Sequence, residues 1–181
     1  ATNQPQVADS PVEKVFAVDL DVESGVERNR LNTWFESSKK KMHGYDNIHI
    51  QNVYSVNIHT MTDAFDSGLG NVTEVFHGTS QANCLSILKS GLQVAPPSTA
   101  AIAGKMFGNG IYGAIHSTKS LGYTFGRWGQ GSTGTGWLFV CDFAMGKYYE
   151  TKSATQPKPG YDSIWAKAGQ SLYHDELIVY K

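Results

Sequence analysis

Three short segments of this 181-residue chain carry side chains that could do chemistry, although about a hundred residues separate the first from the last. His77 and Gly78 follow a short apolar run, and Glu176 opens the last apolar run. Between them lie Tyr112 and Tyr123. Imidazole and carboxylate groups can exchange protons or stabilise charge, and tyrosine rings can stack on a flat cation. Each residue alone has an ordinary role in packing or at a strand end, so a site requires a fold that joins the segments.

Hydrophobic periodicity predicts the elements that must position these residues. Strands are predicted over residues 12–22, 47–59, 73–77, 110–114, 137–144 and 176–180, and helices over 27–42, 79–90 and 117–125. Thr79 or Ser80 should cap the second helix and Gly91 should close it. Many strands with few helices, and no regular alternation of the two, predict an α+β fold.

Two patterns could suggest ligand binding, a nucleic-acid patch and a dinucleotide-binding loop, but both are better explained by local structure. Lys39-Lys40-Lys41 falls in the last turn of the first predicted helix, where cations complement the helix dipole, so we expect a solvated helix end. Gly129–Gly134 matches the G-x-G-x-x-G pattern of dinucleotide-binding loops. Here a predicted helix precedes the pattern and a predicted strand follows it, which is the reverse of what that loop needs, so we interpret it as a surface turn.

Length and composition indicate a single folded domain. At 181 residues, 40% hydrophobic and 17% charged, the chain can bury a core, and it is neither disordered nor a long charged helix. With two cysteines we expect no disulfide framework and no four-ligand zinc set. No apolar run is long enough for a membrane span and no secretory leader is evident, so we expect a cytoplasmic or otherwise intracellular protein without a membrane partner.

Charge is unevenly distributed along the chain. Residues 1–75 carry six basic and eleven acidic side chains, whereas residues 76–181 carry nine and five. A mildly basic C-terminal part suits an anionic ligand. Wholesale binding of nucleic acid needs a denser basic surface than this.

From Thr73 to Tyr180 the sequence resembles the catalytic domain of the poly(ADP-ribose) polymerase family, the diphtheria-toxin-like ADP-ribosyltransferases with a His-Tyr-Glu triad. The motifs that carry the resemblance are His-Gly-Thr at 77–79, Asn83, Ser-Gly-Leu at 90–92, Ala-Pro-Pro at 95–97, Met-Phe-Gly-Asn-Gly-Ile-Tyr at 106–112, Lys-Ser-Leu-Gly-Tyr at 119–123 and Glu-Leu-Ile-Val-Tyr at 176–180. Residues 1–72 resemble only the lead strand, helix and strand of the family. We therefore expect one catalytic domain over 1–181, with 73–181 as its core.

The resemblance implies two facing antiparallel sheets with NAD+ bound in the cleft between them. It implies three catalytic residues, His77, Tyr112 and Glu176. The residues implied to bind NAD+ are His77, Gly78, Thr79, Asn83, Tyr112, Ala114, Lys119, Ser120 and Tyr123. In this scheme His77 binds the adenine-side ribose, Gly78 and Ser120 bind the nicotinamide carboxamide, and the two tyrosines bracket the nicotinamide ring. Asn83 and the loop 95–109 would line the adenosine and diphosphate side, with the loop acting as a lid.

The implied reaction transfers ADP-ribose from NAD+ to a protein or nucleic-acid acceptor. Cleavage of the nicotinamide–ribose bond builds positive charge on the ribose, and a carboxylate such as Glu176 stabilises that charge. Asp175 points to the opposite face of a strand and is assigned no chemistry. Nicotinamide leaves as a neutral molecule, so no metal is expected.

Three alternatives for function stay open, together with the number of ADP-ribose units added. The chain could transfer ADP-ribose to a macromolecule, pass it to water as an NAD+ glycohydrolase, or bind NAD+ or ADP-ribose without turnover. With 72 residues ahead of the core, we expect no DNA-break-sensing module. Gln93, Asn109 and Gly113 depart from the family pattern, which has a basic residue, a lysine and a bulky aromatic residue there, and these departures concern NAD+ affinity rather than reaction class.

Overall fold

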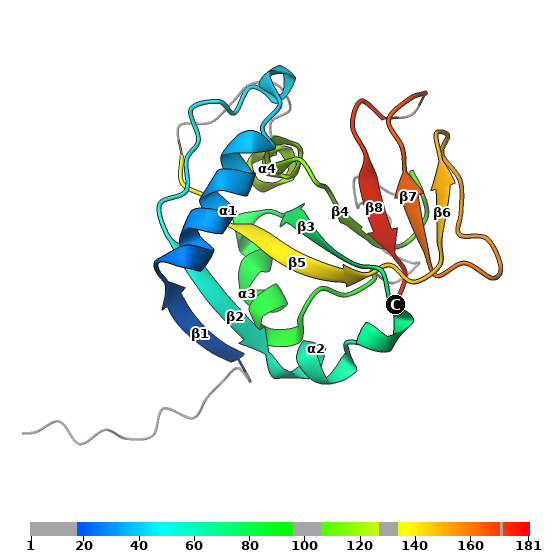
Figure 1. Cartoon of the computed structure of the whole chain (residues 1–181), viewed down its shortest axis with the longest axis horizontal. Coiled ribbons are helices and arrows are strands. Elements are labelled where there is room, and N and C mark those ends of the chain that lie inside the picture. Colours follow the sequence, from blue (N-terminus) through cyan, green and yellow to red (C-terminus); the bar gives the residue numbers. More distant parts are fainter. Residues whose placement is uncertain (1–17, 96–105, 127–133, 171) are drawn as a thin grey trace, which may run out of the picture.

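The computed structural model describes residues 18–95, 106–126, 134–170 and 172–181 (Figure 1). Its strands are β1 (Val18–Glu23), β2 (Val53–Ile58), β3 (Val72–Gly78), β4 (Ile111–Gly113), β5 (Leu138–Ala144), β6 (Tyr148–Thr151), β7 (Ser163–Ala166) and β8 (Glu176–Val179). Its helices are α1 (Val26–Ser37), α2 (His59–Ala64), α3 (Gln81–Ser90) and α4 (Ser117–Phe125), with 3-10 turns η1 (Lys41–His43) and η2 (Ser67–Leu69).

The described strands form three sheets. β3 and β5 pair antiparallel in the centre, with the β1–β2 pair on one side and the four-stranded sheet β4-β8-β7-β6 on the other (Figure 1). Within the four-stranded sheet, β8 runs antiparallel to both β4 and β7, whereas β6 and β7 are parallel. The mixed α+β architecture predicted from the sequence is thus confirmed, with one parallel pair that the prediction did not include.

The central pair and the four-stranded sheet share a hydrophobic core. Val75 of β3 and Phe143 of β5 pack with Ile111 of β4 and Leu177 of β8. Side chains alternate along a strand, so the residues that follow Val75 on β3 and Leu177 on β8 point away from this core. Phe76 joins a second core under α1 and α4, and Ile178 joins a third on the outer face of the four-stranded sheet.

The first helix is shorter than predicted. α1 ends at Ser37 instead of residue 42, and η1 follows as a separate turn. The hydroxyls of Ser37 and Ser38 donate to backbone carbonyls three residues back, which favours the end of a helix. Lys39 is also not a solvated cation: its side chain is 10% exposed, lies 2.8 Å from Glu36 and donates to the Ile48 carbonyl.

The predicted strand over 47–59 is only partly correct. Residues 47–52 form no strand, because the Ile48 and Gln51 carbonyls accept hydrogen bonds from the Lys39 and Arg28 side chains instead of a neighbouring strand. His59 begins helix α2, which the sequence prediction missed.

The remaining predicted elements differ mainly at their ends. The part of the predicted strand 12–22 before residue 18 lies outside the described residues, as do most of the loop 95–109 and of the turn Gly129–Gly134. Gly91 closes α3 with φ 74°, as predicted, but neither Thr79 nor Ser80 caps that helix through its side chain. β6 and β7 were also missed, since four-residue strands carry too little periodicity to detect.

None of the helices in the described ranges is long and apolar enough to cross a membrane. The longest of them, α1, has 12 residues.

Candidate active site

The fold brings together the three segments singled out in the sequence. Phe76 and Ala114 form a two-hydrogen-bond bridge, N to O at 2.8 and 2.9 Å, that joins β3 to the end of β4. β4 also pairs with β8, so that Tyr112 lies opposite Ile178 and Gly113 opposite Leu177. The segments around residues 77, 112 and 176 therefore occupy adjacent strands. Ala114, which was predicted to bind NAD+, is buried and serves as the link between the two sheets.

His77 is fixed in one hydrogen-bonding state. Its Nδ1 lies 2.8 Å from the Tyr112 carbonyl, which can only accept, so Nδ1 carries the proton. Burial lowers the pKa of His77, although the bond to the carbonyl opposes that effect. The ring is then neutral at pH 7 and Nε2 is left as an acceptor, a form suited to a hydroxyl donor such as a ribose.

Gly78 lets β3 approach α4 more closely than any other residue would permit. A Cβ at position 78 would lie 1.8 Å from the Ser120 carbonyl oxygen, a backbone atom with little freedom to move. The Ser120 hydroxyl, which is buried, lies 2.9 Å from the Phe76 carbonyl and donates to it. The His-Gly pair on β3 and the Lys-Ser pair on α4 are thus packed against each other, as a shared ligand site requires.

Thr79 and Asn83 lie at the start of α3, on the exposed side of this arrangement. Asn83 Nδ2 donates to Thr79 Oγ1 over 2.9 Å. Asn83 is exposed, whereas Thr79 is half-buried. Both side chains are polar groups at the rim of the site rather than in its interior.

Glu176 and Lys119 form a buried ion pair. Lys119 Nζ lies 3.1 Å from Glu176 Oε1, and the two side chains are 8% and 6% exposed. Lys119 also donates to the His174 carbonyl over 2.7 Å. Burial lowers the pKa of Lys119, and the charge of Glu176 acts against that. Removing two charges from water is costly, so a buried pair is weak evidence for a stabilising role.

Two tyrosines lie next to the same carboxylate. Burial raises the pKa of Tyr123, and Glu176 adds to the shift by its charge and a hydrogen bond. Burial raises the pKa of Tyr112 to about 12, again with a contribution from Glu176. The Tyr112 hydroxyl donates to the Gly108 carbonyl at 2.7 Å and accepts from the Phe107 N–H at 3.0 Å, so Tyr112 anchors the described end of the loop 95–109.

Two further positions, Asp175 and Gly113, lie close to the site without a place in its chemistry. Asp175 turns away from Lys119 and binds the Trp165 indole and the Ala168 N–H, each at 2.8 Å. At Gly113, a Cβ would lie 2.5 Å from Val75 Cγ2 and close to Phe143, so the core occupies the space that a bulky aromatic side chain would need.

The role of Lys119 as the partner of Glu176 could not be predicted from the sequence, because 57 positions separate the two residues. A group of three histidines beside this pair, His43, His116 and His174, was also missed, since no motif singles it out. In the part of the chain that the structure describes, no three His, Cys, Asp or Glu side chains are arranged to hold a metal ion.

Comparison with known proteins identifies the family. The model of the "Poly(ADP-ribose) polymerase catalytic domain" matches residues 26–178. The human protein mono-ADP-ribosyltransferase PARP3 is 35% identical over 124 residues, which cover 65% of this chain and 22% of that protein. Human poly [ADP-ribose] polymerase 2 is 32% identical over 141 residues, 78% of this chain and 23% of that protein.

A third human protein, the mono-ADP-ribosyltransferase PARP4, is 30% identical over 155 residues, which cover 77% of this chain and 9% of its own length. The chain thus spans less than a quarter of these relatives. The family match begins well before residue 73 and so includes β2 and α1 as well as the site segments. The chain therefore belongs to the poly(ADP-ribose) polymerase catalytic domain family.

Proposed function

We propose that this chain is the catalytic unit of an NAD+-dependent ADP-ribosyltransferase, with Glu176 as the residue that stabilises the reacting ribose. The observation that carries the proposal is the buried Glu176 carboxylate, held by Lys119 at 3.1 Å and next to Tyr112 and Tyr123. Membership of the family supports the reaction class.

The groups on β3 and α4 fit NAD+ in their hydrogen-bonding chemistry. Nε2 of His77 accepts a hydrogen bond from a ribose hydroxyl. We assign the Gly78 backbone to the flat carboxamide, since the missing side chain lets β3 and α4 meet at this site, and Ser120 Oγ can accept from its amide. Tyr112 and Tyr123 supply aromatic faces for the cationic nicotinamide ring. We assign Thr79 and Asn83 to the exposed adenosine side.

The bond that breaks explains why a carboxylate is needed. When the bond between nicotinamide nitrogen and ribose carbon breaks, both electrons leave on nicotinamide, which becomes neutral, and positive charge develops on the ribose. Glu176 stabilises that charge where it develops, and it can accept a hydrogen bond from a ribose hydroxyl. A nucleophile of the acceptor then forms the new bond to the ribose and loses its proton.

The acceptor and the number of transferred units are the finer parts of the proposal. The similar proteins include both mono-ADP-ribosyltransferases and a poly(ADP-ribose) polymerase by name, and we propose a protein acceptor for this chain, with nucleic acid as the other outcome. The mildly basic C-terminal part of the chain suits the diphosphate of NAD+.

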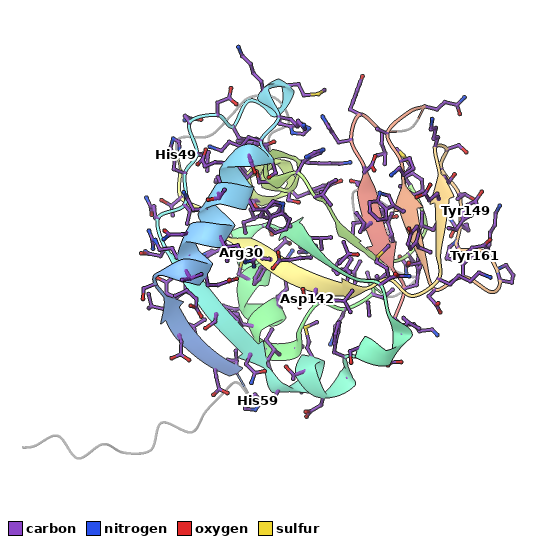
Figure 2. The ribbon with its side chains drawn as sticks, viewed as in Figure 1. Arg30, His49, His59, Asp142, Tyr149 and Tyr161 are labelled. Atoms are coloured by element: carbon purple, nitrogen blue, oxygen red, sulfur yellow. The ribbon has the colours of Figure 1, made fainter. Side chains whose placement is uncertain are left out.

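The test is incubation of the chain with adenylate-labelled NAD+ and a cell lysate, following free nicotinamide and labelled macromolecules together. Glu176→Gln should lower turnover by at least about 100-fold while much of NAD+ binding remains, as expected for loss of one electrostatic stabiliser. Asp142→Asn is the matched control, because Asp142 is an exposed carboxylate on β5, away from β8 (Figure 2).

Label on macromolecules that disappears in Glu176→Gln supports the transferase, and the size spread of the product separates chains from single units. Nicotinamide release without label would instead support an NAD+ glycohydrolase. Binding of NAD+ without release would support the binding module, and equal activity of Glu176→Gln would remove Glu176 from the mechanism.

A further inference from the structure

Three histidines from separate segments meet beside the buried ion pair. His43 belongs to η1, His116 precedes α4, and His174 lies two residues before Glu176. The ring centroid of His174 is 4.8 Å from that of His43 and 4.9 Å from that of His116, each in an edge-to-face arrangement. The His174 ring is thus fixed from both sides.

The backbone of His174 connects this histidine trio to the site. Its carbonyl accepts the hydrogen bond from Lys119 Nζ at 2.7 Å, and the same Nζ lies 3.1 Å from Glu176 Oε1. A shift of the His174 ring would move the carbonyl and, with it, one of the two groups that hold Lys119. The trio is therefore linked to Glu176 through the hydrogen bond from Lys119 to the His174 carbonyl and the ion pair of Lys119 with Glu176.

The trio is built at an energetic cost. The Nδ1 atoms of His116 and His174 are buried and have no hydrogen-bond partner among the described residues. A buried polar atom without a partner destabilises a fold by about 1–3 kcal/mol, and an aromatic hydrocarbon ring of similar size would fill the space without that cost. At these two atoms the rings therefore act through packing and not through hydrogen bonds.

The surroundings of the trio disfavour a positive charge. Lys40, before η1, lowers the pKa values of all three histidines, and Lys119 from α4 lowers those of His43 and His174. Asp175 raises the pKa values of His116 and His174, and a hydrogen bond with the Ser38 backbone raises that of His116. Burial is the largest cause in all three, and it lowers the pKa of His43 to about 4, with the other two histidines contributing. Thr118 Oγ1 accepts from the Lys40 N–H and lies 2.8 Å from His43 Nδ1, consistent with a neutral His43 that accepts from the hydroxyl.

We propose that His43, His116 and His174 are positioning residues for the transfer reaction: as three neutral rings they hold the His174 carbonyl against Lys119, and through Lys119 they keep Glu176 in place. The inference rests on the proposed function of Glu176. A proton on the trio adds a second cation beside Lys119, so acid weakens the arrangement.

The central experiment compares a neutral and a charged replacement at one position. His174→Phe keeps the edge-to-face packing, and its kcat for nicotinamide release at pH 7.5 should stay within about threefold of wild type. His174→Lys places a permanent cation in the trio and should lower kcat by at least about tenfold, with KM for NAD+ changed by less than about twofold. Equal kcat values for the two variants, or a loss confined to KM, would overturn the inference.

A pH profile of the wild-type chain gives a second reading that does not depend on the folding of a variant. kcat should fall as pH is lowered from about 6.5 toward 4, because folding lowers the histidine pKa values below the ordinary value near 6.5. NMR titration of the trio's ring protons should give midpoints that coincide with this fall. His59→Gln is the control: the His59 side chain is 44% exposed, pairs with Asp19 at 2.7 Å and lies far from β8 in Figure 2, so this variant should keep the wild-type profile.

The outcomes separate the inference from the proposed function. Nicotinamide release that requires Glu176 but ignores the charge at position 174 rejects only the inference. If the wild-type chain releases no nicotinamide, the proposed function fails, and the NMR titration still decides the inference: protonation of the trio must shift the resonances of the Lys119 ammonium, and constant resonances would overturn it.

Discussion

Two ion-paired regions of this molecule use charge in opposite ways. Arg30 on α1 binds Glu27 and Glu74 at 2.6 and 2.8 Å and joins the helix to β3, with its side chain 46% exposed (Figure 2). Lys119 and Glu176 lie at a similar separation, 3.1 Å, but both are almost fully buried. Exposed pairs stabilise a fold by 0 to about 1 kcal/mol, whereas a buried pair is often no better than two packed apolar residues.

The contrast between the two pairs indicates which of them serves the reaction. The Arg30 group can be explained by its attachment of α1 to the central strands, and its charges remain in contact with water. The Lys119–Glu176 pair has no such explanation, because apolar residues would hold β8 against α4 equally well. A buried charge pair between a helix and a strand of a binding site is therefore better explained by the reaction than by stability.

The largest expected effect comes from breaking the buried pair on one side. Lys119→Met leaves Glu176 as an unpaired buried charge and should lower the free energy of unfolding by about 3–5 kcal/mol. Denaturant titration at pH 7.5 measures this. Lys119→Met/Glu176→Leu removes both charges and should recover most of the lost stability without recovering turnover. A double variant as unstable as the single one would show that the pair itself stabilises the fold.

A smaller effect is expected from the steric contact beside the pair. Gly78→Ala pushes a Cβ into the Ser120 carbonyl and should destabilise the fold by about 1–3 kcal/mol while weakening NAD+ binding. Gly68→Ala is the matched control, because its nearest neighbour is the end of the Asp66 side chain at 3.1 Å. Thermal unfolding and NAD+ titration of both variants check this, and similar results for the two would contradict the role given to Gly78.

Acid should destabilise the fold through the buried histidines. Because folding lowers the pKa of His43 from 6.5 to about 4, the unfolded chain binds more protons in this range. Stability is therefore present above pH 6.5 and is lost as pH falls toward 4. The free energy of unfolding, plotted against pH, should fall more steeply for wild type than for His43→Phe between pH 6.5 and 4, and the two slopes should agree above pH 6.5. Equal slopes throughout would mean that folding does not lower the pKa of His43.

The smallest effect is expected at the exposed pair. Arg30→Met should cost less than about 1 kcal/mol, since water already solvates the partners, and the difference from wild type should shrink in high salt. Unfolding at low and high salt measures it. A loss as large as that of Lys119→Met would remove the distinction between the two regions.

Sequence alone predicted the strands and helices that carry strong periodicity, and the motifs around His77, Tyr112 and Glu176 identified the family. It misplaced the end of α1 and the start of β2, because there the side chains of Ser38, Lys39 and Arg28 compete for backbone carbonyls. No periodic pattern records such competition.

Contacts between distant segments could not be predicted from the sequence. The ion pair of Lys119 with Glu176 and the meeting of the three histidines depend on how β8 lies beside α4, which is a tertiary property. Gly113 is similar: its departure from the family pattern has a cause only once Val75 and Phe143 are seen to fill the space.

The bridge between Phe76 and Ala114 also has a consequence for motion. Its two hydrogen bonds cross from the central strands to the four-stranded sheet and lie between His77 on one side and Tyr112 on the other. Their amide protons can exchange only when these hydrogen bonds open, so we expect their exchange with deuterium to be slow. The exchange rates of these two amides would thus report on any opening between β3 and β4 when NAD+ enters or nicotinamide leaves.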